Sequence, residues 1–177
     1  MRKLMLFAIL GSFVISLSNC DLNKYTQFDM EFNSSVTVPQ STGLNLPFDL
    51  FTPDMTTNSS ATFGVNDTDK ELIQEITLTS MKLDITQPGD RDFDFLEEIH
   101  IYINADGLSE IEIASQTDVP ADVDQLDLNV NANDLKEYIK KDKFQLRVEA
   151  TTDELLSNDV NIDVKSVFFV DAEILGI

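Results

Sequence analysis

The chain has 177 residues, with 32 Asp and Glu against 12 Lys and Arg, and a formal net charge of −20. Nucleic acid binding requires concentrated basic residues, and the densest basic cluster, residues 136–144, also contains acidic residues, so we expect no nucleic acid partner. A hydrophobic content of 42% with 12 Phe predicts a folded core rather than a disordered acidic tail. The length suits one domain.

Residues 1–19 have the composition of a secretory signal peptide. Arg2 and Lys3 precede an uncharged run from Leu4 to Leu17 that consists of apolar and small residues. This run is shorter than the roughly 20 apolar residues that a helix needs to span a bilayer, and it suits the hydrophobic region of a cleaved signal. The only cysteine of the chain, Cys20, follows directly after this segment.

The stretch Leu17-Ser18-Asn19-Cys20 resembles the lipobox of bacterial lipoprotein precursors, an aliphatic residue and two small residues before an invariant cysteine. Asn19 departs from the pattern, because Ala, Gly or Ser is usual there. The resemblance implies cleavage between Asn19 and Cys20, a diacylglyceryl group on the Cys20 sulfur, and often acylation of the new amine. Two or more acyl chains anchor a protein stably. The alternative is an ordinary signal cut after Ser18, with Cys20 left as a free thiol.

The predicted mature chain is more acidic than the precursor. Arg2 and Lys3 are the only charged residues of 1–19, so residues 20–177 carry a formal charge of −22. We predict a lipidated tether over 20–27 and one domain over 28–177. A lipidated Cys20 leaves no thiol, so the core must hold the fold without a disulfide. Anionic lipids would repel this domain, so we expect membrane association through Cys20 alone.

Alternation with a period of two residues dominates the first part of the domain. It predicts strands over 28–32, 35–38 and 60–66. The segment 46–51, a short apolar run at Pro47 and before Pro53, is predicted to be an edge segment or loop rather than a central strand.

The middle of the chain combines strands with short helical turns. We predict helical turns over 66–74 and 93–98, and a strand over 75–85 whose alternation changes phase. A one-residue β-bulge near Ser80 would restore a common face. Strands over 98–104 and 111–115 are predicted to form a hairpin across the loop that contains Gly107.

The last part of the chain contains the clearest helix signal. Asn133 or Asp134 can cap a helix within 131–142, which is preceded by a strand over 126–131 and followed by one over 143–150. In the final segment, 160–175, Val167 and Phe169 are apolar on the face opposite the main apolar set. We therefore predict a central strand covered on both sides.

Together these elements predict an all-β protein, a two-sheet antiparallel β-sandwich, immunoglobulin-like or related, of about seven to nine strands with one short helix. A closed barrel with an interior ligand cavity is the alternative.

The residues that could form a site lead us to predict no cofactor and no metal site. His100 is the only histidine and is interpreted as a surface residue of a strand; one His and one Cys exclude an ordinary zinc site. Asp90, Asp92 and Asp94 alternate as in a calcium loop, but the EF-hand pattern is absent, and we interpret them as an extended acidic loop.

No residue pattern names a reaction, so we expect no catalytic residues and no enzyme activity. The absence of Trp and the presence of only three Tyr argue against a carbohydrate partner. The lipobox and the composition resemble small envelope lipoproteins of Bacteroidota-type bacteria, which implies an outer-membrane location on the periplasmic or surface face. The main hypothesis is a non-catalytic interaction module that contacts an envelope protein through loops, an exposed apolar patch or an unprotected sheet edge.

Two alternatives remain open. The first is a calcium-dependent adhesive or ligand-binding domain, which calcium would stabilise against heat. The second is an envelope hydrolase that uses carboxylates, which requires a deep pocket with carboxylates of perturbed pKa.

Overall fold

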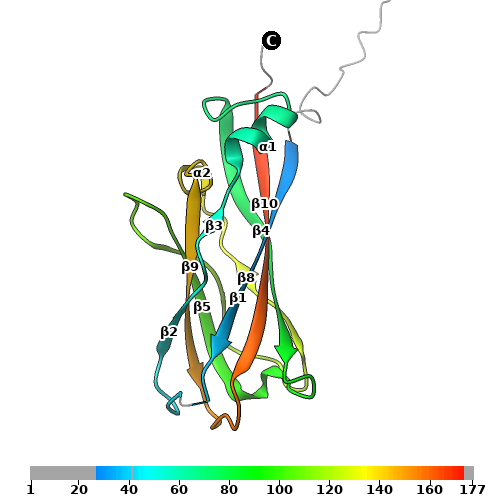
Figure 1. Ribbon diagram of the computed structural model, residues 1–177, viewed down its shortest axis with the longest axis vertical. Helices are drawn as coiled ribbons and strands as arrows, with labels where there is room; N and C mark the ends of the chain where they lie inside the picture. Colours follow the sequence, from blue (N-terminus) through cyan, green and yellow to red (C-terminus); the bar gives the residue numbers. More distant parts are fainter. Residues whose placement is uncertain (1–26, 41, 174–177) are drawn as a thin grey trace, which may run out of the picture.

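The computed structural model describes residues 27–40 and 42–173, which form two antiparallel β-sheets packed face to face (Figure 1). The first sheet has the strand order β1-β10-β4-β7. Its strands are β1 (Gln27–Val38), β10 (Val160–Ala172), β4 (Ile73–Gln87) and β7 (Gln125–Asp127). The second sheet has the order β2-β9-β5-β6-β8, and β3 also pairs with β9. Its strands are β2 (Phe48–Phe51), β3 (Met55–Thr56), β5 (Leu96–Asn104), β6 (Ile111–Gln116), β8 (Asn129–Val130) and β9 (Lys143–Thr152).

This architecture confirms the predicted two-sheet β-sandwich. The described residues contain ten strands, more than the seven to nine expected, because β3, β7 and β8 are only two or three residues long. Both sheets end in open edge strands, so the structure is not the closed barrel that the sequence left as an alternative.

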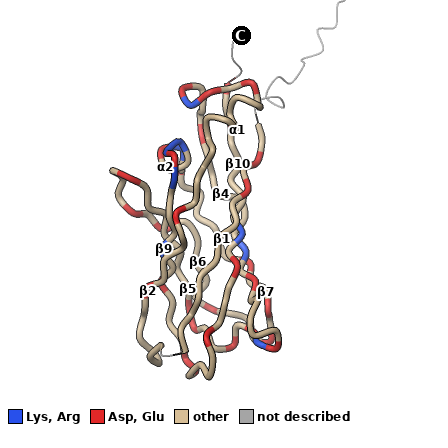
Figure 2. Tube along the Cα trace, viewed as in Figure 1, with Lys and Arg blue, Asp and Glu red and all other residues tan. Residues whose placement is uncertain are grey.

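The molecule is elongated, and its strands run along the long axis (Figure 1). The beginning of β1 and the end of β10 lie at the same end of the sandwich, next to α1 (Ser59–Val65), because Gln27 pairs with Asp171. Acidic residues occur on most elements, whereas basic residues are few and scattered (Figure 2).

The long strand β10 lies between β1 and β4, as predicted for a central strand. Its inward-facing side chains alternate along the strand and are buried: Val160, Ile162, Val164, Phe168, Val170 and Ala172. Val167 and Phe169 face the other side and are only half-buried, so the prediction that both faces are covered was wrong. Neighbouring side chains of the same sheet shade them, since Val167 lies opposite Glu31 and Phe169 opposite Asp29.

The predicted bulge in β4 is confirmed. Val167 of β10 lies opposite Ser80, and the next residue, Phe168, lies opposite Leu78, so Thr79 is the extra residue. The bulge lets Ile76 and Leu78 share the core with Met81 and Leu83, and all four are buried. The β5–β6 hairpin and a 3-10 turn over Phe93–Phe95 also form where they were predicted.

The strand predicted over 60–66 and the helical turn predicted over 66–74 both need correction. Residues 59–65 form α1, not a strand, because Ser59 and Phe63 are both buried at the helical spacing of four residues. The left-handed backbone of Asn58, with φ 49°, turns the chain into this helix, and the residues after Val65 form turns instead of the predicted helix.

The second helix, α2, covers only Lys136–Ile139, so it is shorter than the segment that the sequence predicted. Its start is fixed by Asp134, whose Oδ1 accepts hydrogen bonds from the backbone N–H groups of Lys136 (3.1 Å) and Ile76 (3.2 Å). Asp134 therefore ties the helix to β4 rather than only capping it. Burial raises the pKa of Asp134, but these hydrogen bonds and the Lys136 ammonium outweigh burial and hold the pKa below its usual range.

Candidate functional site

The strand β1 is by far the longest edge strand among the described residues. Its 12 residues pair with β10 along the full length, and no described strand pairs with its other side. The other terminal strands in the sheet order, β7, β2 and β8, have three, four and two residues. Proteins usually keep edge strands short or covered, because an open edge can pair with another chain. The free side of β1 is therefore the leading candidate for a binding site.

Side-chain hydrogen bonds between β10 and its two neighbours, β1 and β4, show which backbone groups of β1 point away from β10. Ser166 Oγ donates to the carbonyl oxygen of Phe32 in β1, whereas Thr79 Oγ1 and Thr86 Oγ1 of β4 donate to the carbonyl oxygens of Val167 and Asn161. Even-numbered β10 residues thus bond toward β1 and odd-numbered residues toward β4.

The β1–β10 register has no shift, so the same parity holds along β1. The even-numbered residues of β1 bond to β10, and the odd-numbered residues point their N–H and C=O groups away from it. The outward set comprises Asp29, Glu31, Asn33, Ser35 and Thr37. These groups offer a hydrogen-bonding ladder to an added strand.

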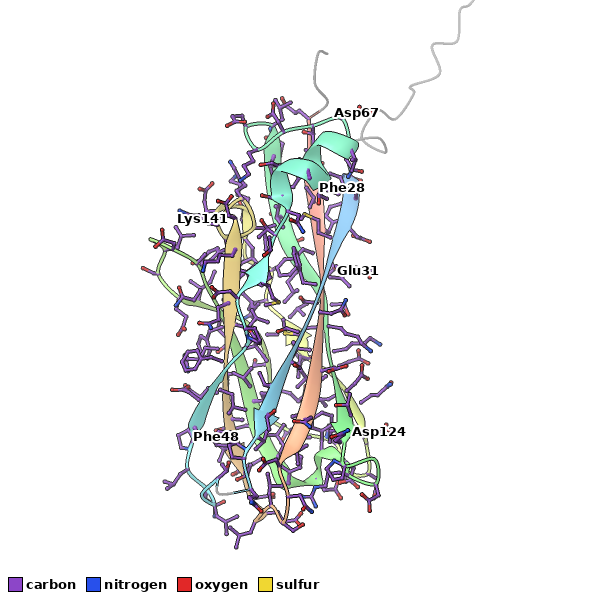
Figure 3. All side chains as sticks on the ribbon, in the orientation of Figure 1. Phe28, Glu31, Phe48, Asp67, Asp124 and Lys141 are labelled. Carbon is purple, nitrogen blue, oxygen red and sulfur yellow. The ribbon has the colours of Figure 1, made fainter. Side chains whose placement is uncertain are left out.

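A groove, which we call the β1 groove, runs along this free edge. Residues 29–35 of β1 form one wall and residues 53–58 form the other. Two hollows in the groove share Glu31, Phe32 and Thr56 and have volumes of about 470 and 270 Å³. In Figure 3, Phe28 and Glu31 mark the upper and middle parts of this strand.

The second wall of the β1 groove is fixed to β9, not to β1. Met55 and Thr56 pair with Phe144 and Lys143. Two further bonds flank this pairing: Thr52, just before the wall, donates its N–H to Leu146 O of β9 (3.0 Å), and Thr57 N donates to Asp142 O, just before β9 (2.9 Å). In the described part of the chain, no backbone hydrogen bond joins this wall to β1, so the outward groups of β1 face open space.

The inner side of the β1 groove is apolar and rigid. Phe32 is half-buried, and its ring contacts Phe144 and Phe168 edge-to-face, with centroid distances of 5.0 and 5.6 Å. Met55 of the opposite wall is buried. An aromatic side chain held by two others presents a fixed apolar surface without further ordering.

The charged side chains that line the β1 groove are all acidic, namely Asp29, Glu31 and Asp54, and Asp142 lines a neighbouring hollow at the α1 end. Asp54 forms an ion pair with Lys143, and Asp142 lies 3.7 Å from Lys70 Nζ. Asp29 and Glu31 are exposed and form no ion pair with the described residues. The groove thus carries two carboxylates that the described residues do not neutralise.

A second acidic region, the charged face, covers the outer side of the second sheet. It consists of Asp49, His100, Tyr102, Glu110, Glu112, Arg147 and Glu149. The Arg147 guanidinium lies 2.8 Å from both Glu110 Oε1 and Glu149 Oε2, and it lies 4.0 Å from the centroid of the Tyr102 ring. Asp49 Oδ1 is 2.5 Å from the same guanidinium. Hydrogen bonds that the guanidinium donates, first to Glu110 and then to Glu149 and Asp49, raise the pKa of Arg147 against the effect of burial.

His100 lies on this charged face and is half-buried between carboxylates. Its Nδ1 is 3.1 Å from Glu112 Oε2, and its Nε2 is 3.9 Å from Glu98 Oε2. Burial raises the pKa of Glu112, but hydrogen bonds from His100 and Asn131 outweigh it and hold the pKa below 4.5. A hydrolytic general acid needs the opposite shift, so Glu112 is not suited to that role.

Of the three alternating aspartates, which were interpreted as an extended acidic loop, Asp92 and Asp94 but not Asp90 belong to a carboxylate cluster. Asp92 and Asp94 approach Asp122, with one carboxylate oxygen of each within 4.8 Å of the others. Two of these carboxylates already accept backbone hydrogen bonds, from Asp94 N to Asp92 Oδ1 (3.2 Å) and from Asp122 N to Asp94 Oδ1 (2.7 Å). These bonds account for the cluster as a support for two turns.

The predicted lipidation and cleavage residues, Cys20 and Asn19, lie outside the described residues, so they remain predictions. The sequence predicts a sheet edge as one form of binding site but does not identify β1, because its pattern predicts two short strands, over 28–32 and 35–38, in place of one. Apolar residues at the even positions from Phe28 to Val38, interrupted only by Ser34, are the signal for one continuous strand, but they do not show that it is an edge strand.

Among the described residues, no helix has both the length and the apolar content needed to cross a membrane.

No family model and no curated protein matches this chain. One solved structure that aligns with it is titled desmodium yellow mottle tymovirus, at 10% identity and a TM-score of 0.33. The alignment covers all of this chain and 92% of that one. This likeness is too low to carry an argument about either fold or function.

Proposed function

We propose that this protein is a lipid-anchored, non-catalytic binding module of a bacterial cell envelope, and that it holds a protein partner along the free edge of β1. The unpaired edge of β1 carries the proposal, because it is 12 residues long and lies open beside a groove. Such an edge binds another chain through backbone hydrogen bonds, which require no catalytic residue.

The start of β1 determines which end of the sandwich an anchor at Cys20 would hold. Gln27, where β1 begins, is seven residues after Cys20, a segment that spans at most about 25 Å when fully extended. A lipid at Cys20 would keep the α1 end of the sandwich near the membrane, on the outer membrane in the favoured case. The edge of β1 then runs from that end away from the lipid (Figure 1).

The anchor is tested by replacing Cys20 with Ser in the native host. We expect the wild-type protein to incorporate radiolabelled fatty acid and to enter the detergent phase on partitioning, and the variant to do neither. Equal partitioning of the two proteins would overturn the anchor, but not the binding edge.

The binding edge is tested by photo-crosslinking in the same host. A crosslinking amino acid is placed at Ser35 on β1 and, as the matched site, at Gln125 on β7, the short edge of the same sheet. We expect one discrete protein adduct from position 35 only. Adding Asn33→Pro should abolish it, because proline removes an outward N–H and is tolerated at an edge; Asn33→Ala, which keeps the N–H, should preserve it.

Adducts of equal yield from both positions, or an adduct from position 35 that survives Asn33→Pro, would overturn binding at the edge. Circular dichroism melts confirm that each variant is folded before the comparison is made.

A further inference from the structure

The β1 groove differs in chemistry between its two sides. An added strand alternates its side chains, so one set would lie on the outer face, beside Asp29 and Glu31, and the other would point inward, toward Phe32. The outer positions meet two carboxylates that no described cation neutralises, whereas the inner positions meet an aromatic ring. Each side therefore selects a different class of residue.

The spacing of the two carboxylates matches the period of a strand. Asp29 and Glu31 are two residues apart on β1, and both are exposed on the outer face. Residues directly opposite each other in paired strands have Cβ atoms about 5 Å apart, and opposite charges there are favourable. A partner strand can therefore place basic side chains over both carboxylates at alternate positions.

The inner side selects apolar residues. The groove wall from Pro53 to Thr56 lies across from Glu31–Ser35, and the open hollow between them has a volume of about 470 Å³, large enough for several side chains. Phe32 forms its aromatic floor, and water that covers this ring is released when an apolar side chain replaces it.

We propose that the occupant of the β1 groove is an extended segment of a partner protein that adds as a strand to β1, with basic side chains over Asp29 and Glu31 and apolar side chains against Phe32. This inference rests on the proposed binding edge and specifies the partner. A second copy of this chain fits less well, because its β1 would bring its own Asp29 and Glu31 and its net charge of −20.

The test measures peptide binding to the full chain in an uncharged detergent, by fluorescence anisotropy. The probe is a nine-residue peptide that alternates lysine and valine. Three further peptides serve as controls: one with glutamate for lysine, one with glutamine for lysine, and one lysine peptide with N-methyl groups on alternate residues, which cannot form the ladder.

We expect the lysine peptide to bind best, the glutamine peptide more weakly, and the glutamate and N-methylated peptides not to bind. The protein variant D29N/E31Q should weaken binding of the lysine peptide about tenfold, since each charge pair contributes up to about fivefold. The matched variant E97Q/D118N removes two exposed carboxylates outside the groove and should leave this affinity unchanged.

The remaining outcomes separate the inference from the proposed function. Equal binding of the lysine and glutamine peptides, unaffected by D29N/E31Q, would overturn the basic specificity and leave the edge as a binding site. Equal binding of the lysine peptide and its N-methylated form would overturn strand addition, and with it both proposals.

Two further results would overturn the inference alone. One is the absence of binding by any peptide, although the Ser35 crosslink forms in cells. The other is a dimer in sedimentation that Asn33→Pro dissociates, because the occupant would then be a second copy.

Discussion

The charged face and the β1 groove are both acidic, but they differ in what neutralises their carboxylates. On the charged face, Arg147 lies among Asp49, Glu110 and Glu149, and all three are within 2.8 Å of its guanidinium. In the groove, Asp29 and Glu31 have no ion pair among the described residues. The same type of residue is thus neutralised within the fold in one region and left without an ion pair among the described residues in the other.

The backbone shows the same difference. The charged face lies over the centre of the second sheet, where β5 and β9 pair from Leu96 to Asn104 and each of these strands has a neighbour on both sides. The β1 groove lies at an edge, where half of the backbone groups point outward. Internal satisfaction of both backbone and charge is what a scaffold requires, and the lack of both is what the proposed binding edge requires.

The largest effect on the free energy of unfolding is expected from the removal of Arg147. Arg147→Met leaves three carboxylates close together without their cation, so it should lower the free energy of unfolding by about 2 kcal/mol. Arg147→Lys keeps the charge but cannot form the forked hydrogen bonds. Its free energy of unfolding should lie between those of the wild type and Arg147→Met. Urea denaturation at pH 7 measures both, and a loss below about 0.5 kcal/mol for Met would show that the charged face is not a scaffold.

The sequence predicted the sheets better than either acidic region. The alternation of Ile99, Ile101 and Ile103 with polar residues predicts that these three side chains are buried, and the change of phase near Ser80 predicts the bulge. The charged face and the groove depend on which strands become neighbours. Arg147 meets Asp49 across 98 residues of sequence, and no local pattern reports such a contact.

The edge position of β1 has the same origin. Alternation predicts that Phe28 to Val38 form a strand, but it does not state how many partners the strand has. The misassigned α1 shows a related limit, because Ser59 and Phe63 are buried by the packing of the whole sandwich. A seven-residue segment is too short to show a helical period clearly.

A smaller effect is expected from Glu112 on the charged face. Its folded pKa lies below 4.5, so its contribution to stability is present above pH 4.5 and is lost as the pH falls through the folded pKa. Glu112→Gln should cost roughly 1 kcal/mol at pH 7 and progressively less in acid. Acid-titrated urea midpoints measure this difference; Asn131→Ala, which removes one donor, should show a part of it. A constant difference between wild type and Glu112→Gln across the acid range would contradict the linkage.

The smallest effect on stability is expected in the β1 groove. D29N/E31Q removes two exposed carboxylates that no described residue binds, so the free energy of unfolding should stay within about 0.5 kcal/mol of wild type. Any change should be a gain, because the chain carries a net charge of −20 and loses two like charges. Thermal melts of this variant beside E97Q/D118N measure it. A loss above about 1 kcal/mol would mean that Asp29 and Glu31 support the fold, and the contrast with the charged face would then disappear, because a carboxylate that the fold requires is not free to bind a partner.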